Sequence, residues 1–359
     1  MKNFSMNELY QLAWSKPSLA QVELTHNCNQ RCIFCYNGHF ENQNFKNLAE
    51  TEWLVIFQKL FQLGIRDLNL TGSETFLYPN LIFLLKKAKE IGFRIRIDTN
   101  GMLDISEAIP YVEEFAFSVH GIGKTHEEIT QTPGSFANLE ENLLKALSNN
   151  VKILINMTLT KINYHQIKTV YEHFSNYSQN FKFSPFLAIP SNEGRNFDQH
   201  LLTINREFLK NYIGQLRTIP AERLVLKHGF HSIFINNPGH YDCSQILLPN
   251  CAGGKNKIVV DYDGAVYPCN FFKGKEHYCG NILTDDATKI WRSGKGFLPF
   301  RSLITEEKIP STCKKCAKKP RCFSGCRAWT KLYRKGEFDY EKDIRCGLGA
   351  AYLRSRDNE

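Results

Sequence analysis

The chain has no hydrophobic run long enough to cross a membrane, and its N-terminus lacks the charged-then-apolar layout of a signal peptide. No apolar stretch in its 359 residues reaches the roughly 18 residues that a membrane-spanning helix needs. The net charge of +9 is not gathered into one basic helix or a long Lys/Arg run, and basic residues do not alternate with aromatic ones as in proteins that bind single-stranded nucleic acid. We therefore expect a cytoplasmic protein that binds neither membranes nor nucleic acid.

Cysteine, by contrast, is abundant and clustered. In a reducing compartment the 12 cysteines do not form a disulfide framework, and their close spacing points to metal binding. The apolar content of 42% is sufficient for an ordinary core. The length predicts one large and one small domain.

Three cysteines lie in one short segment near the N-terminus. Cys28, Cys32 and Cys35 follow residues 21–25, whose alternating pattern predicts a strand. Three thiols in one loop can hold three corners of an iron–sulfur cube, which leaves the fourth iron open to a substrate or cofactor. Single cysteines are commonly buried as small hydrophobic residues, but three at this spacing favour a catalytic cluster.

With Phe34 before the last cysteine, the triplet resembles the signature of the radical S-adenosylmethionine (radical SAM) enzymes. The resemblance implies a 4Fe-4S cluster on Cys28, Cys32 and Cys35, with the amino and carboxylate groups of SAM on the fourth iron. An electron from the reduced cluster would cleave SAM to a 5′-deoxyadenosyl radical that abstracts a substrate hydrogen atom. It also implies an oxygen-protected setting and a reductant such as flavodoxin or ferredoxin.

Helical and strand-like segments alternate up to about residue 215. The predicted helices span residues 51–63, 79–91, 136–149 and 164–177, and further strands span 65–70, 93–97, 115–119, 152–157 and 181–186. Such βα units imply a parallel sheet. Six of them predict an α/β fold with a partial (β/α)6 TIM-type barrel, and a doubly wound open sheet is the alternative.

In such a barrel the chemistry lies at the carboxyl ends of the strands. The segment Thr71-Gly72-Ser73-Glu74-Thr75 resembles the family's Gly-Gly-Glu-Pro segment, which binds the methionine end of SAM, although Ser73 and Thr75 replace the second Gly and the Pro. The predicted SAM-binding residues are Phe34, Gly72, Ser73, Glu74, Asn100, Ser118 and Leu187. His120 stands where many relatives carry Asp and is either structural or a ligand contact.

The last third of the chain holds nine further cysteines. Residues 257–262 and 265–267 predict a hairpin that turns at Asp263-Gly264. The spacing of these cysteines, taken alone, would also suit a structural zinc site. The array resembles the SPASM extension of radical SAM enzymes, a small Cys-rich domain with two auxiliary 4Fe-4S clusters. The predicted ligands, with an eighth thiol before the seven of the motif, are Cys243, Cys251, Cys269 and Cys326 for one cluster and Cys313, Cys316, Cys322 and Cys346 for the other.

This resemblance leaves Cys279 as a spare thiol, buried or on the surface, and gives three 4Fe-4S clusters in all. We predict an N-terminal extension over residues 1–18, the barrel over 19–215, a bridging region over 216–240 and the SPASM domain over 241–359. We expect no leader-binding domain before the barrel, because the first strand begins near residue 20.

The resemblance favours an enzyme that modifies a peptide or protein by a cross-link, thioether, epimerisation or oxidation, with the auxiliary clusters relaying electrons. A separate leader-peptide-recognition protein is an expected partner. A small-molecule or tetrapyrrole substrate is the alternative, and a non-catalytic zinc module is the least favoured. A sulfatase-maturase role is disfavoured because Asn270 stands where those relatives carry an acidic base, unless Asp242, Asp261 or a Tyr replaces it.

Overall fold

The fold is organised by a curved sheet whose first six strands run parallel in chain order. The computed structural model describes residues 16–37, 45–189, 200–202, 205–225, 251–302, 310–315 and 325–328. The six strands are β1 (Leu19–Val22), β2 (Asp67–Leu70), β3 (Arg94–Thr99), β4 (Glu114–Ser118), β5 (Lys152–Leu159) and β6 (Phe181–Leu187). Each pairs with the next along the chain, which confirms the partial barrel and excludes a doubly wound sheet.

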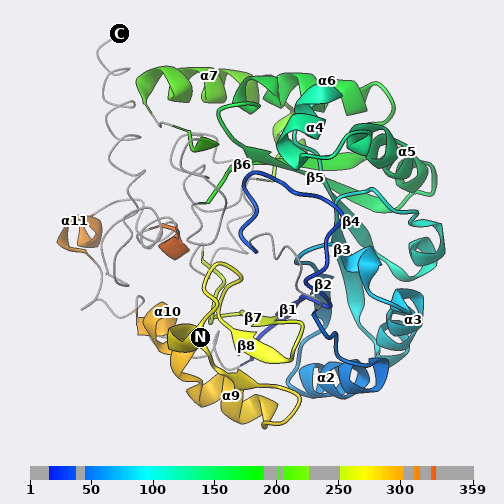
Figure 1. Ribbon diagram of the computed structural model, residues 1–359. Helices are drawn as coiled ribbons and strands as arrows, with labels where there is room; N and C mark the ends of the chain where they lie inside the picture. Colours follow the sequence, from blue (N-terminus) through cyan, green and yellow to red (C-terminus); the bar gives the residue numbers. More distant parts are fainter. Residues whose placement is uncertain are drawn as a thin grey trace, which may run out of the picture.

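The helices that follow these strands in the chain lie outside the sheet (Figure 1). They are α2 (Glu50–Gln62), α3 (Leu81–Ile91), α4 (Lys124–Thr130), α5 (Ser135–Ser148), α6 (Ile167–Ser175) and α7 (Arg206–Leu216). Helix α2 shows why they pack there, because Trp53, Ile56, Phe57 and Leu60 form one helical stripe and are all fully buried. In the described part of the chain, none of the helices has the length and apolarity to span a bilayer.

Short 3-10 helices fill several connections, and the first strand and helix α4 differ from the sequence-based expectations. The 3-10 helices are Thr75–Leu77, Ser106–Tyr111, Tyr164–Gln166, Ala221–Arg223, Lys275–His277 and Lys295–Phe297. The first strand begins at Leu19 and ends at Val22, where it is paired on both sides, rather than spanning 21–25. Helix α4 was not anticipated, because its seven residues contain one apolar side chain, Ile129, and hence no periodic signal.

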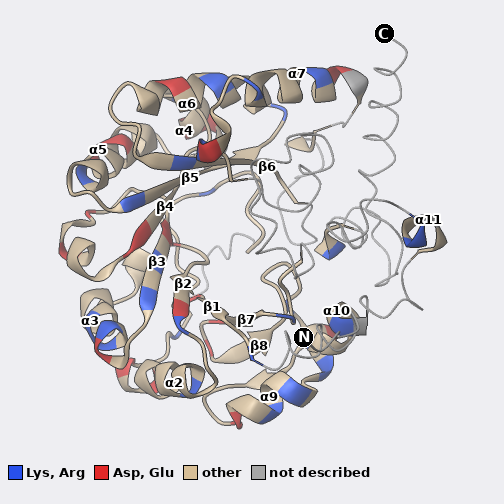
Figure 2. Cartoon of the chain, turned by 180° about the vertical axis from the view of Figure 1, so that it is seen from behind, with Lys and Arg blue, Asp and Glu red and all other residues tan. Residues whose placement is uncertain are grey.

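The strands alternate between an apolar outer face and a polar inner face. In β3, Ile95 and Ile97 are buried in the core below the helices, whereas Arg96 and Asp98, on the opposite face, are partly exposed. Charged residues accordingly appear on β2, β3 and β4 as well as on the outer helices (Figure 2). The barrel lumen is therefore lined by polar side chains.

The predicted hairpin is confirmed, and it continues the barrel sheet. Strand β7 (Lys257–Val260) lies parallel to β1 in the register Leu19↔Lys257, and β8 (Ala265–Tyr267) and β9 (Gly280–Asn281) follow antiparallel. Gly264 forms the turn at a φ of 83°. Helices α9 (Ala287–Ser293), α10 (Leu298–Ser302) and α11 (Ser311–Lys314) complete the described C-terminal region. Figure 1 shows β7, β8 and α9 beside β1 and α2, so the two regions share one sheet.

Candidate functional site

The cysteine loop, residues 28–35, leaves the carboxyl end of β1 and is tied to the end of α4. The backbone N–H groups of Arg31 and Ile33 donate to the carbonyls of Thr130 and Ile129, each at 3.0 Å. These are last-turn carbonyls, which have no partner within their own helix. The unanticipated helix α4 thus positions the loop over the mouth of the barrel.

The three thiols of the loop lie close enough for their charges to interact. Burial raises the pKa of Cys28 to about 12, with smaller contributions from Glu74 and Cys35. Burial also raises the pKa of Cys32, and the charges of Cys35 and Cys28 add to the effect. Three mutually close, partly buried thiols form the donor set that an iron–sulfur cluster needs, because bound iron supplies the positive charge that stabilises thiolates. The residues present therefore fit the cluster.

Glu74 links the second and third strand ends beneath this loop. Its carboxylate, which is fully buried, accepts hydrogen bonds from the backbone N–H of Asn100 at 2.8 Å and from the Thr99 hydroxyl and the Phe76 N–H at 3.0 Å. Burial raises the pKa of Glu74, and these three donors oppose the rise. Glu74 therefore has a structural role, and its contact with SAM stays a prediction.

Asn100 connects the same strand end to the cysteine loop. Its Nδ2 donates to Asn29 Oδ1 at 2.7 Å and lies 4.0 Å from the sulfur of Cys28. Its Oδ1 accepts from the backbone N–H of Met102 at 3.0 Å. The structure thus brings Asn100, predicted to bind SAM, into contact with the loop that carries the predicted cluster ligands.

Gly72 lies at the end of β2, beside Ser73, and is required by its backbone conformation. Its φ is +110°, and a Cβ there would lie 2.7–2.9 Å from the side chain of Glu23. Any other residue would be strained and would displace this carboxylate. Gly72 and Ser73 are both partly exposed at the barrel mouth, as a ligand contact requires.

Phe34 packs edge-on against His120, with ring centroids 4.7 Å apart. The backbone N–H of Thr158 donates to His120 Nδ1 at 3.3 Å, so the neutral ring carries its proton on Nε2. The backbone N–H of His120 donates to His126 Nδ1 at 3.1 Å. Burial lowers the pKa of His120 well below its ordinary range and that of His126 to about 4. The pair is therefore neutral at pH 7 and fixes the β4 end against the loop.

The last two predicted SAM-binding residues lie in different environments. Ser118 is partly exposed at the end of β4, whereas Leu187 is 2% exposed and belongs to the hydrophobic core. Strand alternation places Phe186, which is partly exposed, on the lumen side of β6. The side chain of Leu187 therefore packs under the helices, and the backbone is the part of this residue that remains for a ligand contact.

A buried ion network, formed by Glu23, His26, Asp261 and Lys273, joins the cysteine loop to the hairpin. The Nζ of Lys273 lies 2.8 Å from Glu23 Oε2 and 3.1 Å from Asp261 Oδ1, and His26 Nε2 lies 2.6 Å from the same oxygen of Asp261. Hydrogen bonds and the charges of Lys273 and His26 outweigh burial and lower the pKa of Asp261 to about 2. The network holds the two regions together across β1 and β7.

Glu23, His26 and Asp261 also have their ligand atoms within 4.8 Å of one another, which is close enough for a metal ion. The Lys273 ammonium already provides the positive charge there, so we assign the cluster to a salt-bridge network. Sequence reasoning had named Asp261 but not the other three residues. The available signal was Glu23, a lone charge at the end of an apolar strand.

Two of the predicted C-terminal ligands approach each other beside the hairpin. Burial raises the pKa of Cys269, the charge of Lys257 lowers it, and the charge of Cys251 raises it. The sulfurs of Cys251 and Cys269 therefore lie close enough for their charges to interact. Gly253 provides the close fit, because a Cβ there would lie 2.8 Å from Pro268 O and 3.6 Å from the Cβ of Cys269. These thiols fit an iron–sulfur cluster.

The remaining C-terminal predictions are met only in part by described residues. Cys313 and Cys326 are partly exposed, and Cys243, Cys316, Cys322 and Cys346 lie outside the described residues, as do most of residues 1–18 and 226–240. Cys279, predicted as a spare thiol, is buried, and its Sγ–H donates to His277 O at 3.5 Å. The Asn270 side chain is hydrogen-bonded to the Tyr36 hydroxyl, which also donates to Glu23 Oε1 at 3.5 Å.

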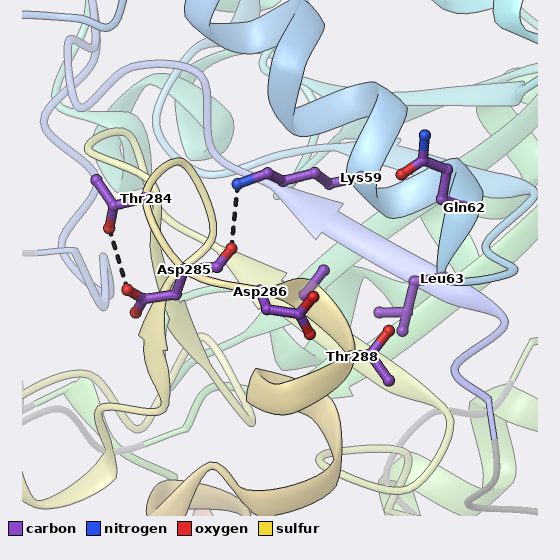
Figure 3. Close-up of a pocket in the computed structure, with 8 residues that line it drawn as sticks. Lys59, Gln62, Leu63, Thr284, Asp285, Asp286 and Thr288 are labelled. Atoms are coloured by element: carbon purple, nitrogen blue, oxygen red, sulfur yellow. Dashed lines mark hydrogen bonds between the residues drawn. The ribbon is translucent and has the colours of Figure 1, made fainter.

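One pocket lies at the opposite end of the barrel, where α2 leads into β2. It has a volume of about 320 Å³, and Figure 3 shows its lining of Lys59, Gln62, Leu63 and residues 284–288. Lys59 Nζ donates to the carbonyls of Ile282, Leu283 and Asp285 at 2.8–3.1 Å. The lysine thus fastens the C-terminal region to α2, and the pocket is a by-product of this junction.

Two family models match the chain. The Radical SAM superfamily matches residues 22–174, and the SPASM iron–sulfur cluster-binding domain matches residues 251–317. These ranges contain the cysteine loop and the hairpin with Cys251 and Cys269, so the two sequence resemblances are confirmed.

Sequence relatives differ in what their names say they make. The chain is 24% identical over 332 residues to the AdoMet-dependent heme synthase of Methanosarcina barkeri. This alignment covers 87% of the chain and 91% of the relative. The chain is also 24% identical over 165 residues to the sporulation killing factor maturation protein SkfB of Bacillus subtilis. That alignment covers 45% of the chain and 40% of the relative.

Among solved structures, SuiB of Streptococcus suis with SAM bound superposes with a TM-score of 0.71 at 18% identity, covering 93% of this chain and 78% of SuiB. SuiB has also been solved with the precursor peptide SuiA, and that structure superposes with a TM-score of 0.70 at 19% identity, covering 93% and 76%. At this identity the likeness shows a shared fold.

Proposed function

Because the chain carries a radical SAM domain and an iron–sulfur SPASM domain, we propose that it removes a hydrogen atom from a peptide or protein substrate as the first step of a post-translational modification. The cluster on Cys28, Cys32 and Cys35, when bound and reduced, supplies the electron that cleaves SAM. The observation that carries the proposal is the convergence of these three thiols with Asn100 and Gly72 at the barrel mouth.

The protein's own residues would orient SAM and exclude water. Glu74 and Asn100 fix the strand ends under the cysteine loop, and Phe34 with His120 closes its other side. The neutral His120 ring carries its Nε2 proton, to which no described residue offers an acceptor, so it is available to a ligand oxygen or nitrogen. SAM contacts at Phe34, Gly72, Ser73, Glu74, Asn100, Ser118 and the Leu187 backbone belong to this proposal.

Electron balance gives the C-terminal clusters their role. Cross-link formation or side-chain oxidation removes two electrons and two protons from the substrate. Hydrogen-atom transfer to the adenosyl fragment accounts for one electron and one proton. The second electron would pass to an auxiliary 4Fe-4S cluster and the second proton to a base. We propose three clusters in total, with Cys251, Cys269 and Cys326 among the auxiliary ligands.

The charges of the lumen favour a peptide over a substrate with several carboxylates. Within the described residues, Arg96 is paired with both Asp98 and Glu114, and Lys273 is paired with both Glu23 and Asp261. Neither cation is therefore left to bind an anionic group of the substrate. The partial likeness to SkfB and the fold shared with SuiB support the same choice.

A second candidate is a reaction on a heme precursor. It is favoured by one observation, that the similarity to the heme synthase of Methanosarcina barkeri extends over 87% of the chain. The paired lumen cations argue against it, because the carboxylates of a tetrapyrrole would need cationic partners.

The test uses anaerobically reconstituted protein with dithionite and SAM. Iron analysis should give about twelve irons per chain, and 5′-deoxyadenosine should form. Replacing Cys28, Cys32 and Cys35 together by Ala should abolish 5′-deoxyadenosine while the C-terminal clusters remain. Unchanged 5′-deoxyadenosine in this variant would refute radical SAM chemistry at the cysteine loop.

Substrate class is decided by deuterium transfer. Deuterated candidate peptides, including short reading frames encoded beside this gene, and deuterated heme precursors are incubated separately with the enzyme. Deuterium in 5′-deoxyadenosine together with a mass change of the peptide would support the proposal. Transfer from the heme precursor alone would establish the second candidate.

A further inference from the structure

Lys255 is a buried lysine in the loop between Cys251 and β7. Its exposed fraction is 2%, and its backbone N–H donates to Ala252 O at 3.1 Å, which closes a tight turn. Burying an ammonium is costly unless an opposite charge compensates it. In the described part of the chain, no carboxylate forms an ion pair with Lys255 and no acceptor receives a hydrogen bond from its side chain.

Two partly buried lysines near the hairpin differ from Lys255 in this respect. Lys273 lies between Glu23 and Asp261, and Lys257 donates to Gln21 Oε1 at 2.6 Å. Lys255 is therefore the described lysine of this region whose charge has no partner among the described residues, and its burial requires an anion that these residues do not provide.

The charges that act on Lys255 indicate where that anion belongs. Burial lowers the pKa of Lys255, the Cys251 thiolate raises it, and the positive charge of Arg327 lowers it further. Arg327 is itself 2% exposed and directly follows Cys326. Two buried cations thus lie within range of each other next to cysteines, and a negative group beside Lys255 would offset their mutual repulsion.

We infer that Lys255 is the counter-charge of the auxiliary iron–sulfur cluster held by Cys251 and Cys269, and that it raises the reduction potential of this cluster. A thiolate-ligated 4Fe-4S cluster carries net negative charge, which increases by one on reduction. A nearby buried cation stabilises the reduced form more than the oxidised form, because the attraction grows with the charge of the cluster. Lys255 thus acts on the auxiliary cluster through its charge, and the positive charge of Arg327 adds to this effect.

The consequence concerns the direction of electron flow. An auxiliary cluster with a raised potential accepts an electron more readily and returns it less readily to the cluster at the cysteine loop. The inference rests on the proposed function only in requiring an iron–sulfur cluster on the C-terminal cysteines; it does not depend on the identity of the substrate.

The test is an anaerobic redox titration followed by electron paramagnetic resonance, without SAM or substrate. It is carried out in the full chain with Cys28, Cys32 and Cys35 replaced by Ala, so that the signals come from the C-terminal clusters. Lys255→Met removes the charge at similar side-chain volume, Lys255→Arg keeps it, and Lys275→Met removes a charge from the exposed Lys275. Iron content is measured for each protein.

We expect a midpoint potential shifted to more negative values in Lys255→Met, with Lys255→Arg and Lys275→Met close to the parent. Lower iron content in Lys255→Met alone would also support the inference, because the cluster would have lost its counter-charge. An unchanged or more positive potential in Lys255→Met, or the same change in Lys255→Arg, would overturn it. Absence of C-terminal iron from the parent would refute the proposed function as well, whereas the expected shift combined with wild-type enzyme that does not modify peptides would refute the peptide substrate alone.

Discussion

Replacing Lys273 by Met tests whether the buried ion network holds the barrel and the C-terminal region together. Burial alone would lower the pKa of Lys273, but Glu23 and Asp261 raise it above its ordinary value, so the ammonium is stabilised by the two carboxylates. The substitution leaves Glu23, which is fully buried, and Asp261, 6% exposed, without this cation. Breaking a buried pair in this way costs about 3–5 kcal/mol, because an uncompensated charge remains.

A double-mutant cycle separates charge from packing. In Lys273→Met with Glu23→Gln, one carboxylate is neutralised together with its partner and Asp261 retains His26, at 2.6 Å. We therefore expect the double variant to be destabilised by less than the sum of the two single variants. The matched control is Lys87→Met, which removes an exposed lysine 2.6 Å from Glu90 and should cost at most about 1 kcal/mol.

The measurement is anaerobic unfolding in urea, followed by circular dichroism, on protein with equal iron content. The destabilisation should be accompanied by earlier loss of C-terminal iron, because β7 is paired with β1 beside the network. A loss of less than about 1 kcal/mol in Lys273→Met, equal to that of Lys87→Met, would show that Lys273 is solvated and that the network does not join the two regions.

Three further predictions concern the barrel mouth. Gly72→Ala should destabilise the protein and weaken SAM binding, because the added Cβ is strained at φ +110° and lies 2.7–2.9 Å from the Glu23 side chain. The control Gly134→Ala, at φ +75° with nothing within 4 Å of the added Cβ, carries strain alone. Equal thermal melts and equal SAM affinity for the two variants would contradict this prediction. Glu74→Gln should cost about 1–3 kcal/mol, because its amide must face a donor that the carboxylate now accepts, and equilibrium dialysis should show reduced SAM binding; unchanged values would remove Glu74 from the site. The pKa of His126 falls to about 4 from an ordinary value near 6.5, so the unfolded chain binds more protons between these values. The contribution of His126 to stability should therefore be full above about pH 6.5 and fall by up to about 3 kcal/mol as the pH drops towards 4. His126→Asn, which keeps an acceptor for the His120 N–H, should have a shallower slope in urea titrations at each pH, with the remaining slope coming from His120; an unchanged slope would contradict this.

Much of the barrel follows from local sequence patterns. Helix α2 was expected at 51–63 and spans Glu50–Gln62, and β5 was expected from Lys152 and begins there. These elements carry continuous apolar stripes or runs, which local periodicity detects. Helix α4 carries one apolar residue, and its stability comes from contacts that include the cysteine loop, so periodicity could not reveal it.

The candidate site divides in a similar way. Cysteine spacing predicted the cluster role of the cysteine loop, because ligands that come from one loop leave a local signature, whereas the pairing of Cys251 with Cys269 followed from the resemblance to the SPASM extension; as ligand sets both stay predictions. The Leu187 side chain could not be assigned from sequence, because the face of a strand that meets the core depends on its register in the sheet.

The sequence by itself determined the residues on which the proposed chemistry depends: a three-thiol loop, a glycine at a strand end and a second field of cysteines. Tertiary structure alone decided which charges are compensated. Glu23 and Lys273 are 250 residues apart in sequence yet form an ion pair at 2.8 Å, because β7 pairs with β1. Lys255, which looks like any surface lysine in the sequence, is buried, and among the described residues no carboxylate pairs with it. Burial and long-range pairing set the energy of a charge, and neither is encoded in the residues next to it.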